Sequence, residues 1–144
     1  MGELNMPFYL KCLPKKELDG QSITSFFSTG AVTRSKPLLW SFYNALNQHV
    51  IAMRSGDCKI MARLKNDDGY LPKILNVHRG NEALVKNATL TDFELYNLKQ
   101  DVGETQDLST KKPEVLERLK KELTQEYTAL LNDSHIWERQ QGSK

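Results

Sequence analysis

The sequence predicts an α+β fold, in which a small antiparallel β-sheet of about four strands packs against one long C-terminal amphipathic helix. Two alternating segments, 49–54 and 58–65, flank a short glycine turn, and a further strand is expected at 92–98. Apolar residues then recur at three- and four-residue spacing from 113 to 131. Strands followed by one such helix are typical of α+β architecture.

The first part of the chain, residues 1–37, is expected to be an irregular lead-in with one short helix. Asp19-Gly20 is a turn signal, after which Ser22 can cap a helix through Ile23-Thr24-Ser25-Phe26-Phe27. Gly30 is expected to end this helix.

A first strand is predicted within residues 36–44, the segment Lys-Pro-Leu-Leu-Trp-Ser-Phe-Tyr-Asn. Apolar and aromatic residues fall on both of its faces, which favours a strand well covered by neighbours. Trp40 is accordingly expected in the core and not as a platform for a sugar ring.

The next segment, residues 49–65, predicts a β-hairpin whose loop is Ser55-Gly56-Asp57. Gly56 supplies the positive φ that a short hairpin loop requires. In the second strand Cys58, Ile60, Ala62 and Leu64 share one face. Lys59, Met61, Arg63 and Lys65 share the other. This alternation is typical of an antiparallel sheet with one covered face.

Residues 66–91 are expected to be a long excursion, with a possible extra strand near 74–78 or 83–86. The strand at 92–98 leads into Asp101-Val102-Gly103-Glu104, where a glycine in third place predicts a type II turn. Pro113 suits the first position of the final helix, which is expected to stop near Asn132. The sheet-and-helix domain therefore spans 38–131, and 132–144 form a tail.

Composition limits the classes of function. The net charge of +2, with basic residues spread along the 144-residue chain, argues against nucleic acid as a partner. No stretch approaches the roughly 20 consecutive apolar residues of a membrane span. Cys12 and Cys58 are too few for a disulfide framework and are expected to be unpaired thiols.

The segment Glu94-Leu95-Tyr96-Asn97-Leu98, followed by Asp101-Val102-Gly103-Glu104 and Pro113-Glu114-Val115, resembles the C-terminal end of the sulfatase family. This family comprises arylsulfatases and glycan sulfatases of the alkaline-phosphatase-like superfamily. Upstream, Pro37-Leu38-Leu39-Trp40 and Ala52-Met53-Arg54-Ser55-Gly56-Asp57-Cys58-Lys59 resemble the family's strand and hairpin motifs in the same order. The residues that carry the resemblance most directly are Trp40, Gly56, Asp57, Lys59, Glu94, Leu95, Tyr96, Asp101, Gly103, Glu104 and Pro113.

The resemblance covers about residues 13 to 131 and has two departures. Val102 stands where the family usually has proline, and Cys58 where it usually has an aromatic residue. The excursion at 66–91 aligns with nothing in the family, in keeping with the variability of long loops.

The resemblance implies a parent enzyme that hydrolyses sulfate esters, on glycan or aryl substrates. It also implies a formylglycine nucleophile made from the first residue of Cys-x-Pro-Ser-Arg or Ser-x-Pro-Ser-Arg, and a divalent cation, usually Ca²⁺. This chain has neither; Cys12-Leu13-Pro14 lacks the Ser-Arg. We therefore expect no catalytic residue, metal site or cofactor in this chain, and no sulfatase activity from it alone. The implied partner is the N-terminal catalytic domain, and the parent is expected to be periplasmic, secreted or lysosomal.

Loops of this small domain can approach the catalytic pocket in the family fold, so His49, Asn47 and Arg54 are candidates to touch a sulfated sugar at the rim. The competing interpretation is a strand-end histidine and an arginine that only packs. A thiol enzyme using Cys12 or Cys58 with His49 has no supporting motif.

A rival from another class is a stand-alone interaction or dimerisation module with the same fold. It would bind through apolar faces around Phe26, Phe27 and Trp40. Surface exposure separates the two hypotheses. A domain detached from its parent is expected to expose an apolar patch and to be able to self-associate, whereas a true module is expected to hide that patch.

Overall fold

The computed structural model describes residues 20, 22–32 and 34–134. The chain divides into two units, residues 1–36 and 37–144. In the first unit, helix α1 spans Thr24–Thr29, and the Ser22 hydroxyl accepts a hydrogen bond from the Thr24 N–H at 3.3 Å. Gly30 ends the helix with φ 69°, so the predicted stop signal is confirmed. The predicted cap is wrong, because the N-cap residue is Ile23 and the helix has no side-chain cap.

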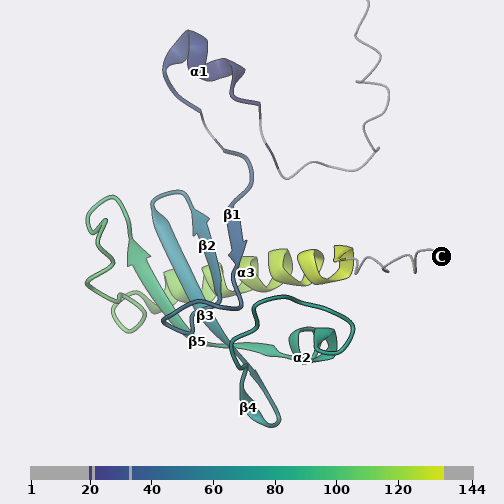
Figure 1. Cartoon of the computed structure of the whole chain (residues 1–144). Helices are drawn as coiled ribbons and strands as arrows, with labels where there is room; N and C mark the ends of the chain where they lie inside the picture. The colour runs from purple at the N-terminus through teal and green to yellow at the C-terminus, as the bar shows by residue number, and fades with distance from the viewer. Residues whose placement is uncertain (1–19, 21, 33, 135–144) are drawn as a thin grey trace, which may run out of the picture. The chain divides into compact units, whose positions relative to one another are not determined.

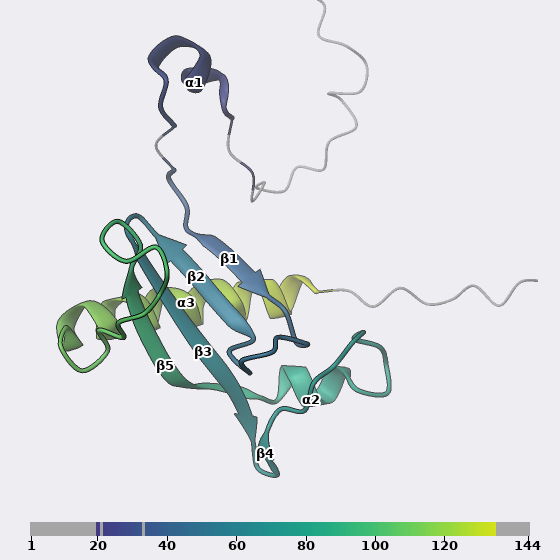
Figure 2. The ribbon, with the colours of Figure 1, turned by 60° about the vertical axis from the view of Figure 1, so that its left-hand side comes forward.

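The second unit is built on one antiparallel sheet with the spatial order β1-β2-β3-β5 (Figures 1 and 2). Its four main strands are β1 Leu38–Ser41, β2 Ile51–Ser55, β3 Cys58–Asn66 and β5 Thr89–Asn97. The two-residue strand β4, Gly69–Tyr70, pairs with the end of β3. The predicted α+β class is confirmed.

The β2–β3 hairpin has the register expected from its alternation, with Met53 opposite Ile60 and Ser55 opposite Cys58. Gly56 adopts φ 61° in the loop, as predicted. One face of the hairpin is apolar and buried, because every second side chain points toward the long helix.

The long helix α3, Pro113–Asp133, covers one face of the sheet (Figure 2). It buries Leu119, Leu123 and Tyr127, spaced by four residues, so the three share one side of the helix. These side chains join a core formed with Val50 and the strand residues Ile51, Met53, Ile60, Ala62, Leu64 and Leu95. Among the described residues, no helix is long and apolar enough to cross a membrane.

The excursion differs from the prediction. Residues 83–86, one of the two suggested strand segments, lie in helix α2, Glu82–Lys86, and 74–78 form no strand. The Asn81 side chain organises this region: it accepts the His78 N–H at 2.8 Å and donates to the Asn76 carbonyl at 3.0 Å. An ion pair of 3.0 Å between Lys86 and Glu82 then supports the short helix.

The predicted type II turn at Asp101–Glu104 is wrong. Gly103 does not adopt a positive φ; Glu104 does, at 54°. The Glu104 N–H donates to the Asp101 carbonyl at 3.3 Å, so the turn closes and the left-handed residue follows the glycine. The side-chain contacts of Glu104, described below, hold it there.

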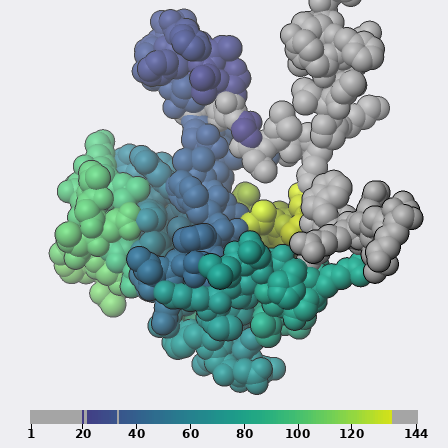
Figure 3. Space-filling view, in the orientation of Figure 1, coloured from purple at the N-terminus to yellow at the C-terminus, as the bar shows by residue number. Residues whose placement is uncertain are grey.

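The predicted cover on both faces of the first strand is also wrong. β1 lies at the edge of the sheet, and Trp40 and Phe42 are 47% and 63% exposed. They lie on the side of the sheet away from α3. Figure 3 views the sheet from this side, with α3 largely hidden behind it.

Candidate functional site

The residues that carry the family resemblance meet in the structure although they are far apart in sequence. The Lys59 ammonium, on β3, donates to both carboxylate oxygens of Glu104 at 2.6 and 2.8 Å. The side chains are only 20% and 29% exposed. The hairpin motif and the turn motif are therefore joined by a partly buried ion pair.

A second link joins the hairpin loop to the end of β5. The Leu98 N–H donates to the Asp57 carbonyl at 2.8 Å. The Asp101 carboxylate then accepts the N–H groups of Gln106 and Thr105, both at 2.8 Å. These hydrogen bonds, with Gln106 and then Thr105 contributing most, lower the pKa of the Asp101 carboxyl.

Asp107 fixes the loop along the outer edge of β5. Its carboxylate accepts the Leu95 N–H at 3.0 Å and both the N–H and the hydroxyl of Ser109 at 2.8 and 2.7 Å. Leu108 N–H donates back to the Leu95 carbonyl at 2.7 Å. Burial by itself raises the pKa of Asp107, but the hydrogen bonds from Leu95 and Ser109 outweigh it, so the pKa lies below its usual range.

On the sheet face away from α3, three side chains form a connected row: His49, Glu94 and Tyr96. The His49 Nε2 lies 3.4 Å from Glu94 Oε1, and the Tyr96 hydroxyl donates to Glu94 Oε2 at 2.9 Å. Burial, followed by the hydrogen bond to Glu94, raises the pKa of Tyr96, so its proton is retained. This row can donate and accept hydrogen bonds.

Of the three rim candidates, the structure brings two together. His49 N–H donates to the Asn47 Oδ1 at 3.2 Å, and the His49 side chain is 12% exposed. Arg54 lies toward the opposite end of β2, where its Nε donates to the Gly56 carbonyl at 3.1 Å. A single ligand group at His49 therefore does not reach Arg54.

Cys58 gives no support to thiol catalysis. Cys58 forms no disulfide. It begins β3 and lies opposite Ser55, the last residue of β2, whereas His49 precedes the first residue of β2. The length of β2 therefore separates the Cys58 and His49 side chains. Cys12 lies outside the described residues.

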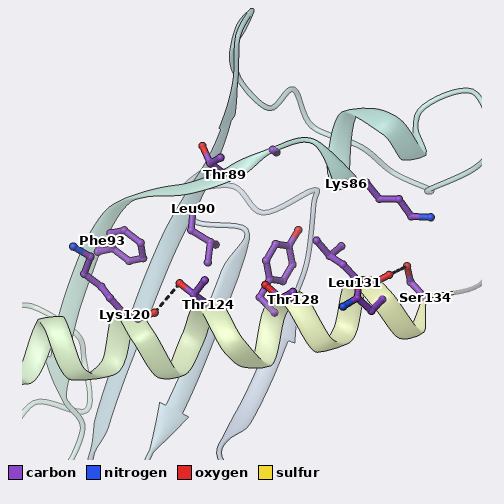
Figure 4. A pocket seen from close by; sticks show the side chains of 12 residues that line it. Lys86, Thr89, Leu90, Phe93, Lys120, Thr124, Thr128, Leu131 and Ser134 are labelled. Carbon is purple, nitrogen blue, oxygen red and sulfur yellow. Dashed lines mark hydrogen bonds between the residues drawn. The ribbon is translucent and has the colours of Figure 1, made fainter.

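A groove of about 840 Å³ lies between α3, the start of β5 and the end of α2 (Figure 4). Its lining combines Phe93, Leu90 and Tyr127 with threonine hydroxyls and two lysines. The Lys120 ammonium lies 5.1 Å from the centre of the Phe93 ring and 2.8 Å from Glu117. Lys86 is paired with Glu82, so both charges of the groove are already partnered.

The sequence interpretation did not identify this groove. Besides Tyr127 and Leu131, its α3 wall has four polar residues that recur every four positions: Lys120, Thr124, Thr128 and Asn132. That spacing marks a polar stripe beside the apolar one and could have indicated the wall. The opposite wall comes from α2 and β5, and α2 was not predicted.

Within the described part of the chain, no group of three or more His, Cys, Asp or Glu side chains could hold a metal ion. No protein-family model matches the sequence. A search of curated proteins likewise finds no match.

Proposed function

We propose that this chain is the non-catalytic C-terminal domain of a sulfatase, whose parent enzyme hydrolyses sulfate esters of glycans or aryl substrates. The observation that carries the proposal is the contact between Lys59 and Glu104 at 2.6 Å. Two motifs that resemble the family separately, 45 residues apart, supply the two halves of one ion pair. This contact indicates that the motif residues have a structural role, in which they fix the hairpin to the turn after β5.

The fold supports the same proposal. The motifs that resemble the family fall, in order, on the first strand, the hairpin, strand β5 with its following turn, and the start of the long helix. Leu95 is buried in the core, and Pro113 begins α3. The motifs thus lie on the strands and helix of the domain and on the two turns that connect them, Gly56-Asp57 and Asp101–Glu104.

The distribution of apolar surface favours a detached domain over a self-contained module. Trp40, Phe42 and Leu46 are exposed at β1 and in the turn that follows it. Leu75 is also exposed. The adjacent Ile74 N–H donates to the Tyr43 carbonyl at 3.0 Å, which holds this segment against the chain that follows β1. Large apolar side chains gathered at one edge are typical of surfaces that a partner covers.

In the proposed parent, this domain closes one side of the fold and shapes the entrance to the active site. The rim role is proposed for His49 and Asn47, which lie together, and not for Arg54. Formylglycine would supply the nucleophile and a divalent cation such as Ca²⁺ the Lewis acid, both from the catalytic domain. Such a parent would be periplasmic, secreted or lysosomal.

The coding sequence upstream of Met1 tests the proposal. We expect it to encode, in the same frame, a catalytic domain with a Cys-x-Pro-Ser-Arg or Ser-x-Pro-Ser-Arg segment. An upstream region without such a segment would contradict the proposal. The purified 144-residue chain should not hydrolyse an aryl sulfate, and measurable turnover would contradict its non-catalytic role.

A further inference from the structure

The edge strand β1 has a defined set of outward-facing backbone groups. Phe42 N–H donates to the Val50 carbonyl at 2.7 Å, and Trp40 and Leu38 are opposite Ala52 and Arg54. In an antiparallel pair every second residue bonds its neighbour, so Leu38, Trp40 and Phe42 bond β2. The N–H and C=O groups of Leu39 and Ser41 therefore point away from the sheet.

Within the described residues, no backbone hydrogen bond from another segment reaches Leu39 or Ser41 on this outer side. Ser41 is exposed and Leu39 is partly exposed. No proline or charged side chain in Leu38–Ser41 blocks the edge, although these are common protections of edge strands. An edge of this kind is a template for another strand.

We propose that β1 pairs with β1 of a second copy of this chain, antiparallel, about a two-fold axis that passes beside Trp40. In this register Leu39 is opposite Ser41 of the partner subunit, and Ser41 is opposite Leu39 of the partner subunit. Each of these pairs exchanges two N–H···O=C bonds, so every outward group of the two residues is satisfied. The edge is self-complementary, which a two-fold dimer requires.

The ends of the strand favour the same register. The Tyr43 carbonyl already accepts the Ile74 N–H at 3.0 Å. The residue that would face it is Pro37 of the partner subunit, which has no N–H to donate. Shifting the partner by two residues would place Leu39 of the partner subunit there, and its N–H would meet an occupied acceptor.

The side chains add apolar contact to the backbone pairing. Trp40 would face Trp40 of the partner subunit at a narrow, non-hydrogen-bonded position, where side chains approach most closely. Phe42 would lie over Leu38 of the partner subunit on the same face. A strand of four residues buries less surface area than a standard protein–protein interface. We therefore expect a weak dimer, with a dissociation constant on the order of micromolar or higher.

Cysteine cross-linking tests the axis directly, in the full chain with Cys12→Ser and Cys58→Ser. Trp40→Cys should form an intermolecular disulfide, because the Cα atoms of a non-hydrogen-bonded pair are about 4.5 Å apart. Phe42→Cys is the matched control, since Phe42 is more exposed than Trp40 but faces Leu38 of the partner subunit. Equal cross-linking of both variants, or none of Trp40→Cys, would overturn the proposal.

A substitution that removes one backbone N–H distinguishes strand pairing from non-specific association of apolar side chains. Sedimentation over a wide concentration series should show the unsubstituted chain approaching twice its monomer mass. Ser41→Pro should abolish this increase, because it removes an outward N–H and leaves the bonds to β2 intact. Ser41→Ala should dimerise like the parent chain, and unfolding curves check that both variants fold.

A chain that stays monomeric at every concentration, or a dimer that Ser41→Pro leaves unchanged, would refute the pairing. The first result would also follow if residues before Pro37 occupied the edge, and it contradicts the proposal equally. Failure of the pairing would leave the sulfatase assignment untouched. Its confirmation would place Trp40 and Phe42 against the second copy, so the assignment would then rest on the Lys59–Glu104 contact and not on this apolar edge.

Discussion

Glu104 combines an unfavourable backbone conformation with a stabilising side-chain ion pair. Its φ of 54° is uncommon for a residue with a Cβ. Its carboxylate binds Lys59 at 2.6 and 2.8 Å in a partly buried position. The sequence correctly predicted a turn here, but it assigned the left-handed conformation to Gly103, because glycine is the residue that adopts it most readily. The contact between Glu104 and Lys59 cannot be predicted from the local sequence.

Replacing the glycines tests this revised turn. Gly56→Ala should destabilise the fold by about 1 kcal/mol, because φ at Gly56 is 61°. Gly103→Ala should be near neutral, since Gly103 is not in the left-handed region and an added Cβ would meet the Thr105 methyl at 3.4 Å. Chemical denaturation of both variants measures the difference; a larger loss for Gly103→Ala would contradict the turn described here.

The Lys59–Glu104 pair predicts an energetic coupling. A double-mutant cycle of unfolding free energies with Lys59→Met and Glu104→Gln should give a coupling free energy of about 1 kcal/mol, since both side chains are largely buried. High salt should reduce the coupling only partly. The exposed pair of Lys99 and Asp57, whose charged atoms are 3.8 Å apart, is the control and should show almost none. Equal coupling in the two pairs would contradict a structural role for Glu104.

Asp107 predicts a pH dependence of stability. Because its pKa is lowered in the folded state, its contribution is fully present above its ordinary pKa of about 4 and is lost as the pH falls through the lowered folded pKa. Asp107→Asn should cost up to about 1 kcal/mol at neutral pH, a value kept small because the residue is exposed. Urea unfolding across an acid series should show the two chains converging at low pH. The control Asp68→Asn, in an exposed turn, should match the parent chain throughout; a constant gap for Asp107→Asn would contradict the assignment.

At the scale of elements, periodicity predicted what depends on local sequence. The hairpin and α3 follow from alternation and from four-residue spacing, and both are present with nearly the expected bounds. Helix α2 was missed because Asn81 organises it through side-chain bonds to His78 and Asn76. The exposure of Trp40 was missed because a strand's position in the sheet is a property of topology, not of its own residues.

The packing of α3 predicts a clear contrast between two leucines. Leu123→Ala should cost about 3 kcal/mol, because Leu123 is 0% exposed and its removal leaves a cavity against the sheet. Leu130→Ala is the matched control on the same helix; Leu130 is 38% exposed, so we expect less than about 1 kcal/mol. Thermal unfolding ranks the two variants. Similar losses would mean that α3 does not pack on the sheet through the side described.

At the scale of the whole molecule, the sequence motifs identified residues that prove to be in contact, but they did not predict the contacts themselves. Lys59 and Glu104 could be singled out from the motifs, yet their contact depends on how the 98–112 loop returns to β3. Among the rim candidates, His49 and Asn47 are adjacent and Arg54 is remote. The His49–Glu94–Tyr96 row and the groove beside α3 depend on long-range packing that no local pattern encodes.

We propose above that this sheet and helix form the C-terminal part of a larger sulfatase. The most direct test of this proposal is the mass and peptide map of the native polypeptide, captured from its source with an antibody raised against residues of α3. We expect a polypeptide much larger than 16.5 kDa that also contains a Cys-x-Pro-Ser-Arg or Ser-x-Pro-Ser-Arg peptide with formylglycine in first place. A native polypeptide of 16.5 kDa, or a larger one without that peptide, would contradict it.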